Sequence, residues 1–551
     1  MKKLKFVVSR RKNKLEDRNL PQARRWVLGL ALATIALTPL MAQDWPSFGH
    51  DPTNDAAIGS KITTRNVHTL KPKWTFTTGG DVSARAAVVK GVAYFPDWGG
   101  NIFAVDASNG QLIWSHQLSD YGLTAGTTSR TSPAVAGGVV YIGTQYNAAA
   151  PVGATGWLLA INASSGALVW KMQPDTSNQF PVITAAPVVV KGVVYVGMTS
   201  NEEYAAADPQ YPCCSVIGST VAVKAKNGRK LWQTFNAPSG YSGANVWGSH
   251  PVVDAARNTV FVGTGNNYSI PYDPAFTQCI AEGGTLVNCL ASNDYSDSIL
   301  ALDMTTGAIK WSTRLMDWNQ QYTQGVANGT DFWNVACLGY VSLANCPAAP
   351  ATGPDYDFGS GPNEITYQTA SGPATILGAG QKSGIYYALD PDTGNVLWQT
   401  QVGPGSGLGG IEWGSASDGN LIYVAICNLY TIPYAAGSAG SWSALDPATG
   451  KIVWQVADPN GSFDLGPLAV AKGVVYAPSM AGSSSTLPTM FALNASTGDI
   501  LWSYAAGSSV IGGATVAEGD VFWGVGISPS LVTVPGFTRG NTFHAFSLNG
   551  Q

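Results

Sequence analysis

One short pattern recurs seven times along this sequence and limits the folds open to the chain. Each copy begins with alanine, continues through a turn that ends in glycine, and closes with an apolar strand that ends in tryptophan. The copies are AVDASNGQLIW (104–114), AINASSGALVW (160–170), AVKAKNGRKLW (222–232), ALDMTTGAIKW (301–311), ALDPDTGNVLW (388–398), ALDPATGKIVW (444–454) and ALNASTGDILW (492–502). Repetition of this kind predicts a repeat architecture, in which each unit packs against the next.

A second hairpin precedes most copies of the pattern. Its strands are apolar, as in SPAVAGGVVYIG (132–143) and APVVVKGVVYVG (186–197). The Gly-Gly and Lys-Gly turns supply the positive φ angles that two-residue hairpins require, and the glycine within each repeat is expected to do the same. Two hairpins make four antiparallel strands, which is one blade of a β-propeller.

The two ends of the sequence together supply an eighth unit. One strand comes from KWTFTTG (73–79), and a shortened repeat comes from HAFSLNG (544–550). Joining them closes a ring and removes exposed sheet edges. We therefore predict an all-β protein, an eight-bladed β-propeller closed by its N- and C-terminal strands. Neighbouring blades are expected to dock through one tryptophan each, namely Trp74, Trp114, Trp170, Trp232, Trp311, Trp398, Trp454 and Trp502.

The first 42 residues differ in composition from the rest. Basic residues precede an apolar run from Trp26 to Met41, which predicts a signal peptide over 1–42, with an uncleaved anchor as the alternative. The propeller then spans 43–551, and we expect the protein in the periplasm or secreted. Charged residues make up 12% of the chain and the formal net charge is -4, which argues against nucleic acid as a partner.

Seven cysteines in an exported chain are expected to meet an oxidising compartment. They form an adjacent pair, two pairs that would each close a short loop, and one residue left over: Cys213 and Cys214, Cys279 and Cys289, Cys337 and Cys346, and Cys427. Spacing alone does not determine their connectivity. No Cys-x-x-Cys-His motif occurs, so covalent c-type haem is excluded and electrons from a redox reaction must pass to another protein.

Several further stretches permit a more specific comparison. They are YFPDWGGNIFAVD, SRTSPAV, SNEEYAAADPQYPCC, VWGSHPVVD, VGTGNNY, DYDFGSGPNE and GAGQKSGIYYALDPDTG. Together with the repeat, they resemble the quinoprotein dehydrogenases, which bind pyrroloquinoline quinone (PQQ), across essentially the whole mature chain. The resemblance is strongest to the quinoprotein domain of polyvinyl alcohol dehydrogenases, and more distant to the methanol and ethanol quinoprotein dehydrogenases.

This resemblance implies a site for PQQ, a planar quinone with three carboxylates. Such a cofactor needs cationic partners, a flat surface to stack on, and a hard metal ion near its reactive carbonyl. The residues implied to bind it are Arg130, Thr184, Trp247 and Lys382, with a Cys213–Cys214 disulfide as a cover on the face opposite the tryptophan. Five residues on predicted loops near blade ends are secondary candidates to contact the cofactor or line the substrate mouth, namely Asn428, Asp97, Trp98, Glu412 and Trp413. The alternatives are a packing role for Trp247, a solvent-facing turn for Lys382, and a reduced cysteine pair.

For the metal, the resemblance implies oxygen ligands of the kind that calcium prefers. The candidates are Glu202 or Glu203, of which Glu202 fits the family spacing slightly better, with Asn266 and Asp357. Asp357 is also the implied catalytic base, with Asp355 as the alternative. Because an Asp-Tyr-Asp arrangement is similar to the lanthanide-using branch as well, in which the first aspartate is the base, calcium and lanthanide both stay open.

We therefore predict an enzyme that oxidises an alcohol, with secondary alcohols and polyvinyl alcohol foremost, using PQQ and a metal ion. Its electron acceptor would be an external cytochrome c. Two alternatives stay open: a non-catalytic propeller scaffold of the outer-membrane-assembly type, which lacks the cofactor residues, and a quinoprotein that acts on sugars. The sequence holds no Gly-x-Ser-x-Gly motif, and its five histidines show no metal-ligand spacing, so it offers no support for a hydrolase.

Overall fold

The computed structural model describes residues 43–551 except 147–155, 249, 317, 319–329 and 483. The described residues belong to the second of two units, Met1–Met41 and Ala42–Gln551. The predicted signal peptide (1–42) lies outside them. Within the described ranges, no helix has both the length and the apolar character needed to cross a membrane.

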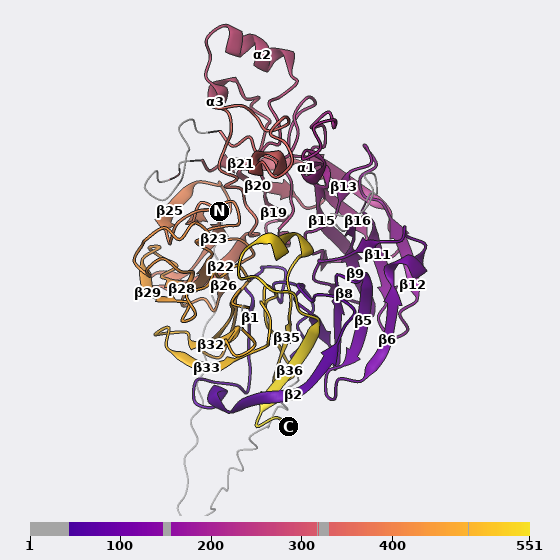
Figure 1. Cartoon of the computed structure of the whole chain (residues 1–551), viewed down its shortest axis with the longest axis vertical. Helices are drawn as coiled ribbons and strands as arrows, with labels where there is room; N and C mark the ends of the chain where they lie inside the picture. Colours follow the sequence, from indigo (N-terminus) through magenta and orange to yellow (C-terminus); the bar gives the residue numbers. More distant parts are fainter. Residues whose placement is uncertain (1–42, 147–155, 249, 317, 319–329, 483) are drawn as a thin grey trace, which may run out of the picture. The chain divides into compact units, whose positions relative to one another are not determined.

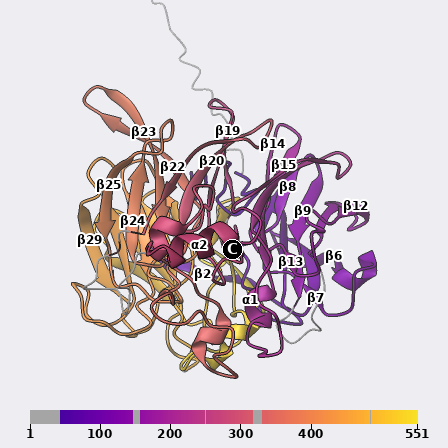
Figure 2. The ribbon, with the colours of Figure 1, turned by 90° about the horizontal axis from the view of Figure 1, so that it is seen from above.

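Eight antiparallel sheets, each built on four strands, follow one another in sequence order (Figure 1). Blades from the N-terminal half and the C-terminal half lie on opposite sides of the unit in Figure 2. The blades are β3, β4, β5 and β6 (Ala87–Val89, Val92–Pro96, Asn101–Asp106, Leu112–Gln117); β8, β9, β11 and β12 (Ala134–Ala136, Val139–Gly143, Leu158–Asn162, Leu168–Met172); β14, β15, β16 and β17 (Val188–Val190, Val193–Ser200, Ser219–Lys224, Lys230–Phe235); β18, β19, β20 and β21 (Val252–Asp254, Thr259–Gly263, Ser298–Asp303, Ile309–Arg314); β22, β23, β24 and β25 (Asn363–Thr369, Gly372–Gly380, Ile385–Leu389, Val396–Gln401); β26, β27, β28 and β29 (Ala416–Ser417, Ile422–Ile426, Ser441–Leu445, Ile452–Ala457); β30, β31, β32 and β33 (Ala469–Ala471, Val474–Pro478, Met490–Asn494, Ile500–Tyr504); and β34, β35, β36 and β2 (Thr515–Ala517, Asp520–Gly524, Thr542–Leu548, Leu70–Thr77).

Short elements decorate this framework. They are the strands β1 (Ala57–Ile58), β7 (Thr127–Thr128), β10 (Gln145–Tyr146) and β13 (Pro181–Val182), the α-helices α1 (Glu202–Ala205), α2 (Pro274–Ala281) and α3 (Leu286–Cys289), and the 3-10 helices η1 (Val67–Thr69), η2 (Leu118–Tyr121), η3 (Val335–Leu338) and η4 (Pro529–Thr533). All three α-helices belong to insertions between the second and third strands of a blade.

The predicted eight-bladed propeller is confirmed, and so is the way it closes. The N-terminal strand β2 pairs with β36 in an antiparallel register that runs from Leu70 opposite Leu548 to Thr77 opposite Thr542. The last blade therefore contains three strands from one end of the chain and one from the other, as expected from the split repeat (Figure 1). Closure of this kind removes the open edges that a curved row of sheets would otherwise present.

The repeat tryptophans join each blade to the next one. Their indole N–H groups donate to a backbone carbonyl of the following blade at 2.8–3.2 Å, from Trp74 to Ala107 around to Trp502, which donates to Leu70 at 3.0 Å. The backbone angle and the packing of the turn glycines explain why glycine is required in each repeat. Gly498 has a φ of 78°, and a Cβ atom there would lie 2.7 Å from the ring of Trp454. Only glycine meets both conditions.

Strand order decides which loops share an edge. In an antiparallel blade, the connection between strands two and three leaves from the same edge as the connection to the following blade. The long insertions 201–218, 264–297, 315–362, 402–415 and 525–541 are all connections of these two kinds. Side chains that are far apart in sequence are thereby gathered at one end of the ring.

Three disulfides form, and they match the cysteine groups seen in the sequence. They are Cys213–Cys214, Cys279–Cys289 and Cys337–Cys346. Cys427 is free and buried. All three bridges lie in the insertions at the loop-rich edge.

Candidate functional site

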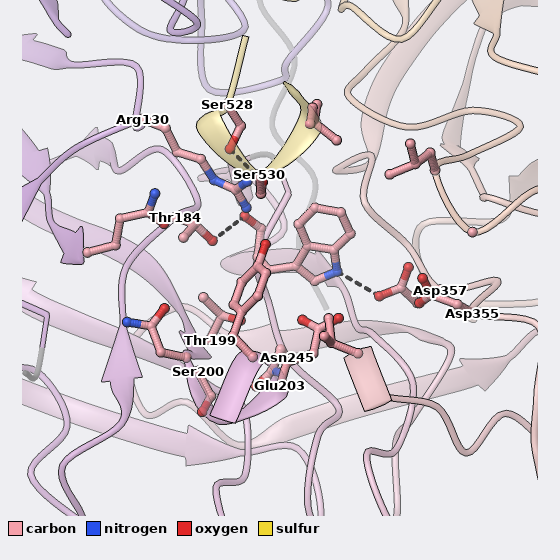
Figure 3. A pocket seen from close by; sticks show the side chains of 18 of the residues that line it. Arg130, Thr184, Thr199, Ser200, Glu203, Asn245, Asp355, Asp357, Ser528 and Ser530 are labelled. Carbon is pink, nitrogen blue, oxygen red and sulfur yellow. Dashed lines mark hydrogen bonds between the residues drawn. The ribbon is translucent and has the colours of Figure 1, made fainter. Parts of the chain in front are cut away.

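A cavity of about 210 Å³ opens among the insertion loops (Figure 3). Its walls come from loops of several blades and from the η4 segment. Eight residues singled out from the sequence line it, namely Arg130, Thr184, Glu203, Trp247, Asn266, Asp355, Asp357 and Lys382. These residues span about half of the propeller sequence, from 130 to 382, and strand order alone brings their loops to this edge.

Trp247 is held firmly inside the cavity. Its backbone carbonyl accepts a hydrogen bond from the Thr184 hydroxyl at 2.7 Å, and its indole N–H donates to Oδ2 of Asp357 at 2.7 Å. Trp413 packs against it edge-on, with 5.4 Å between ring centroids and 82° between planes. A Cβ atom on Gly359 would lie 3.0 Å from the indole, so the glycine keeps space for it. The indole is therefore a fixed planar wall.

Two cations flank this wall. The guanidinium of Arg130 lies 5.7 Å from the centroid of Trp247 and 5.0 Å from that of Trp413, and Lys382 Nζ lies 4.8 Å from the Trp247 ring. Burial lowers the pKa of Arg130, and its Nε is buried without a hydrogen-bond partner. A buried guanidinium with a free donor beside a flat ring suits a planar ligand that carries carboxylates.

Lys382, unlike Arg130, forms ion pairs with carboxylates of the described residues. Its ammonium lies 3.1 Å from Oδ2 of Asp355 and 2.9 Å from Oδ1 of Asp357, and all three side chains are buried. Burial opposes the charged form of the lysine, but the carboxylates of Asp355, Asp357 and Glu412 outweigh it and raise its pKa well above the usual value. The sequence prediction of a functional lysine thus corresponds to a charged ammonium inside the cavity.

Carboxylates outnumber cations in the cavity wall. Four line it, from Glu203, Asp355, Asp357 and Glu412, against the charges of Arg130 and Lys382. Burial raises the pKa of Glu203 and Asp355, and it raises the pKa of Glu412 to about 7. Buried carboxylates in excess are unfavourable unless they are protonated or neutralised by a cation. The wall therefore has the charge balance of a cation site.

The oxygen donors available for such a cation are of the hard type. Asn266 uses its Nδ2 to donate to the carbonyls of Asn267 at 3.0 Å and Trp333 at 2.8 Å, which leaves its Oδ1 as the free acceptor. Glu203 has one long contact, from the hydroxyl of Tyr268 at 3.4 Å. Carboxylate and amide oxygens of this kind are the ligands that calcium and lanthanide ions use.

Glu202 lies outside the cavity, although the sequence slightly favoured it over Glu203. Its carboxylate is fully buried and accepts hydrogen bonds from the Tyr211 hydroxyl (2.5 Å), the Ser215 amide (2.7 Å) and hydroxyl (3.1 Å), and the Val216 amide (2.6 Å). Neighbouring residues on a helix point about 100° apart. In α1, Glu203 therefore faces the cavity, while Glu202 holds the 211–216 loop, and its oxygens are already used.

Two other predicted sites are also absent from the cavity wall. The Cys213–Cys214 disulfide packs against Tyr268, which does line the cavity, so the bridge lies one layer behind it. Asn428 accepts from the amide of Ile432 at 3.0 Å and donates to its carbonyl at 3.0 Å, with a φ of 51°. Its side chain organises its own loop. These positions do not support direct contact with a ligand in the cavity.

Other cavity residues were missed or ranked low from the sequence. Trp98, Glu412 and Trp413 are in loops that drew attention only as secondary candidates, and Tyr268 ends the GNNY motif without having been assigned a role. Ser528 and Ser530 come from the η4 segment, whose sequence carries no repeat or motif (Figure 3). Only the path of the chain reveals that this segment covers the cavity.

The sequence matches the family described as outer membrane protein assembly factor BamB over residues 69–313 and 438–534. The polyvinylalcohol dehydrogenase of Sphingopyxis sp. (strain 113P3) is 28% identical, over 88% of this chain and 73% of that protein. The quinohemoprotein alcohol dehydrogenase of Comamonas testosteroni is 26% identical, over 87% and 71%. The solved quinohemoprotein alcohol dehydrogenase ADHIIG of Pseudomonas putida HK5 superposes with a TM-score of 0.68 at 18% identity, over 92% of this chain and 81% of that one. The resemblance found in the sequence is confirmed.

Proposed function

Because the chain belongs to the PQQ-type propeller family, whose description is outer membrane protein assembly factor BamB, and its relatives are alcohol dehydrogenases, we propose that it is a PQQ- and metal-dependent alcohol dehydrogenase. One observation carries the proposal. A fixed indole plane, a guanidinium with a free donor, and a surplus of buried carboxylates line the same cavity. A planar anionic cofactor with a metal ion satisfies all three.

Each requirement of PQQ has a candidate residue. Arg130 would bind a carboxylate of the cofactor, Trp247 would support its ring, and Lys382 would lie beside its quinone oxygens. Glu203 and Asn266 would hold the metal ion, with Asp357 as an added ligand in the arrangement in which Asp355 is the base. When bound, the quinone supplies a two-electron acceptor and the ion polarises its carbonyl.

The two aspartates of the Asp-Tyr-Asp motif would handle the proton of the alcohol. Asp357 is oriented on both sides, by the indole N–H of Trp247 and the ammonium of Lys382. Asp355 contacts the same ammonium, and burial raises its pKa, so it favours the protonated form after accepting a proton. Asp357 is our first choice as the base, and Asp355 takes that role if Asp357 is bound to the ion.

The finer properties follow from the relatives and the sequence. The substrate would be a secondary alcohol, with polyvinyl alcohol among the candidates, because two relatives carry the name polyvinylalcohol dehydrogenase. Since the chain has no haem-attachment motif, electrons would leave to a separate cytochrome c. The basic and apolar N-terminal segment supports a periplasmic or secreted protein.

Two other functions compete. The family description favours a scaffold for outer-membrane assembly. A scaffold, however, does not require a guanidinium without an ion-pair partner among the described residues, nor the three buried carboxylates and the half-buried Glu203 beside it, since buried charges are costly. The second is a quinoprotein that oxidises sugars in the same cavity.

Reconstitution with PQQ and either calcium or lanthanum tests all three. We expect the protein to retain quinone absorbance after desalting and to reduce a dye with secondary alcohols, and the more active metal identifies the ion. The Arg130→Gln variant should lose retention, whereas Arg229→Gln, at an exposed position, serves as the matched control. A desalted protein without quinone absorbance supports the scaffold, and dye reduction by aldoses alone supports the sugar enzyme.

A further inference from the structure

A second, smaller cavity of about 40 Å³ adjoins the first. The two share Arg130, Thr184, Trp413 and Ser528 in their walls, and the smaller one adds Arg85. A single water molecule needs about 10–15 Å³ of such space. The small cavity can therefore hold a group of a few atoms.

Arg85 is a buried charge with no counter-charge within the described part of the chain. It is 2% exposed, and its terminal nitrogens donate to the carbonyls of Phe48 at 2.7 Å and Leu468 at 2.8 Å. Its guanidinium also lies 5.4 Å and 5.0 Å from the rings of Trp45 and Phe48. Burial lowers its pKa to about 9, and no neighbouring charge offsets this. The carbonyl groups and aromatic rings hold the side chain in place, but they do not neutralise its charge.

Three N–H groups around this cavity have no acceptor among the residues that the structure describes. They are Nε of Arg85, Nε of Arg130 and Nε1 of Trp413, and all three atoms are buried. Buried donors without acceptors are rare because each loses its hydrogen bonds to water on folding. The guanidinium of Arg130 lies 5.0 Å from the Trp413 ring centroid, so two of the three belong to side chains in contact.

We propose that Arg85, Arg130 and Trp413 form an anion site in the small cavity, which takes one carboxylate or one halide-sized monovalent anion. A water molecule could accept from two of these donors, but it would leave the buried charge of Arg85 uncompensated, since no charge of a described residue offsets it. An anion satisfies the donors and neutralises the charge together. The carboxylate could come from the quinone in the adjoining cavity, and in that case alone the assignment rests on the proposed function.

The first test uses protein free of metal and cofactor. Its unfolding temperature is measured in sodium chloride, sodium acetate and, as the reference, the bulky anion gluconate at equal ionic strength. A saturable rise in chloride or acetate is expected, because an anion that binds only the folded state stabilises it. Trp413→Phe should weaken the response and Arg85→Met should remove it. Arg229→Met, at an exposed position, should leave it unchanged.

The second test identifies the source of the anion. If chloride lowers the affinity for PQQ, and Arg85→Lys lowers it about tenfold or more by losing the fork of donors, the cofactor supplies the carboxylate. If the unfolding temperature still responds to the anion while PQQ affinity is unaffected by chloride and by Arg85→Lys, the site holds a free anion. If Arg85→Met fails to fold, Trp413→Phe and Arg85→Lys carry the comparison.

The proposal is overturned if the unfolding temperature shows no saturable response to chloride or acetate and the PQQ affinity is unchanged in Arg85→Lys. Arg85 would then have a structural role alone, holding the N-terminal segment against the blades. A wild-type protein that binds no PQQ but responds to chloride contradicts the dehydrogenase proposal alone. The two failures are therefore distinct.

Discussion

Glu202 and Glu203 are adjacent residues of the same type, but we expect their substitution to have different effects on stability and on metal binding. Glu202 accepts four hydrogen bonds, two of them from backbone amides at 2.7 and 2.6 Å, and its carboxylate is fully buried. Glu203 has a single long contact, and burial raises its pKa. Substituting each in turn by glutamine, which keeps the shape and removes the charge, separates a structural role from a ligand role.

The structure sets the size of each effect. In Glu202→Gln the amide nitrogen replaces one acceptor oxygen. At the Oε2 position it removes the acceptor of the Val216 amide alone, whereas at Oε1 it would remove the acceptor of the other three hydrogen bonds. A buried donor left unsatisfied costs about 1–3 kcal/mol, so with the amide nitrogen at Oε2 the free energy of unfolding should fall by about 1–3 kcal/mol. In Glu203→Gln a poorly solvated carboxylate becomes neutral, so the metal-free protein should be as stable as the wild type or more so. Its affinity for calcium or terbium should fall at least about 100-fold, since changes to groups that only support a ligand already cost 10–100-fold.

Urea unfolding of the metal-free proteins and calorimetric titration with the ion give both quantities. The expected pattern is a crossed one, in which Glu202→Gln loses stability and Glu203→Gln loses the ion. Unchanged stability in Glu202→Gln would show that its hydrogen bonds are dispensable. Full ion affinity in Glu203→Gln would remove it from the metal site and return Glu202 to consideration.

Three further predictions concern the ring and the buried charges. Trp502→Phe removes the donor to the carbonyl of Leu70 at 3.0 Å, so unfolding in urea should lose about 1–3 kcal/mol; an unchanged midpoint would contradict docking through the N–H. Lys382→Met leaves Asp355 and Asp357 without their cation, and should destabilise the metal-free protein by about 3–5 kcal/mol at pH 8. The loss should be smaller at pH 5, where Asp355, whose pKa is raised by burial, accepts a proton more readily. Glu412, with its pKa raised to about 7, binds a proton more tightly in the folded state than in the unfolded one. Its contribution to the stability of the metal-free protein is therefore fully present below about pH 4.5 and should decline by about 3 kcal/mol as the pH rises through 7. Denaturation measured across this pH range would detect the decline, and Glu412→Gln should reduce it.

Much of the fold was predictable because its information is local and repeated. The glycine turn and the terminal tryptophan of each repeat belong to one hairpin and its neighbour, so reading eleven residues is enough to expect both the turn and the docking group. Ring closure followed from the matching partial repeats near the two ends. The gathering of Arg130, Trp247, Asp357 and Lys382 was also predictable in outline. Because strand direction alternates, the connections between strands two and three of a blade and the connections between blades lie at the same edge.

Side-chain direction and distant contact were decided only by the tertiary structure. One helical step separates Glu202, which holds a loop, from Glu203, which faces the cavity, and sequence spacing cannot resolve a rotation of that size. The position of the disulfide behind Tyr268, and the arrival of the 525–541 loop over the cavity, depend on how insertions of irregular backbone pack. The three donors around the small cavity that lack an acceptor among the described residues are visible only once every buried neighbour is known, since a missing acceptor is a property of the whole environment and of no single residue.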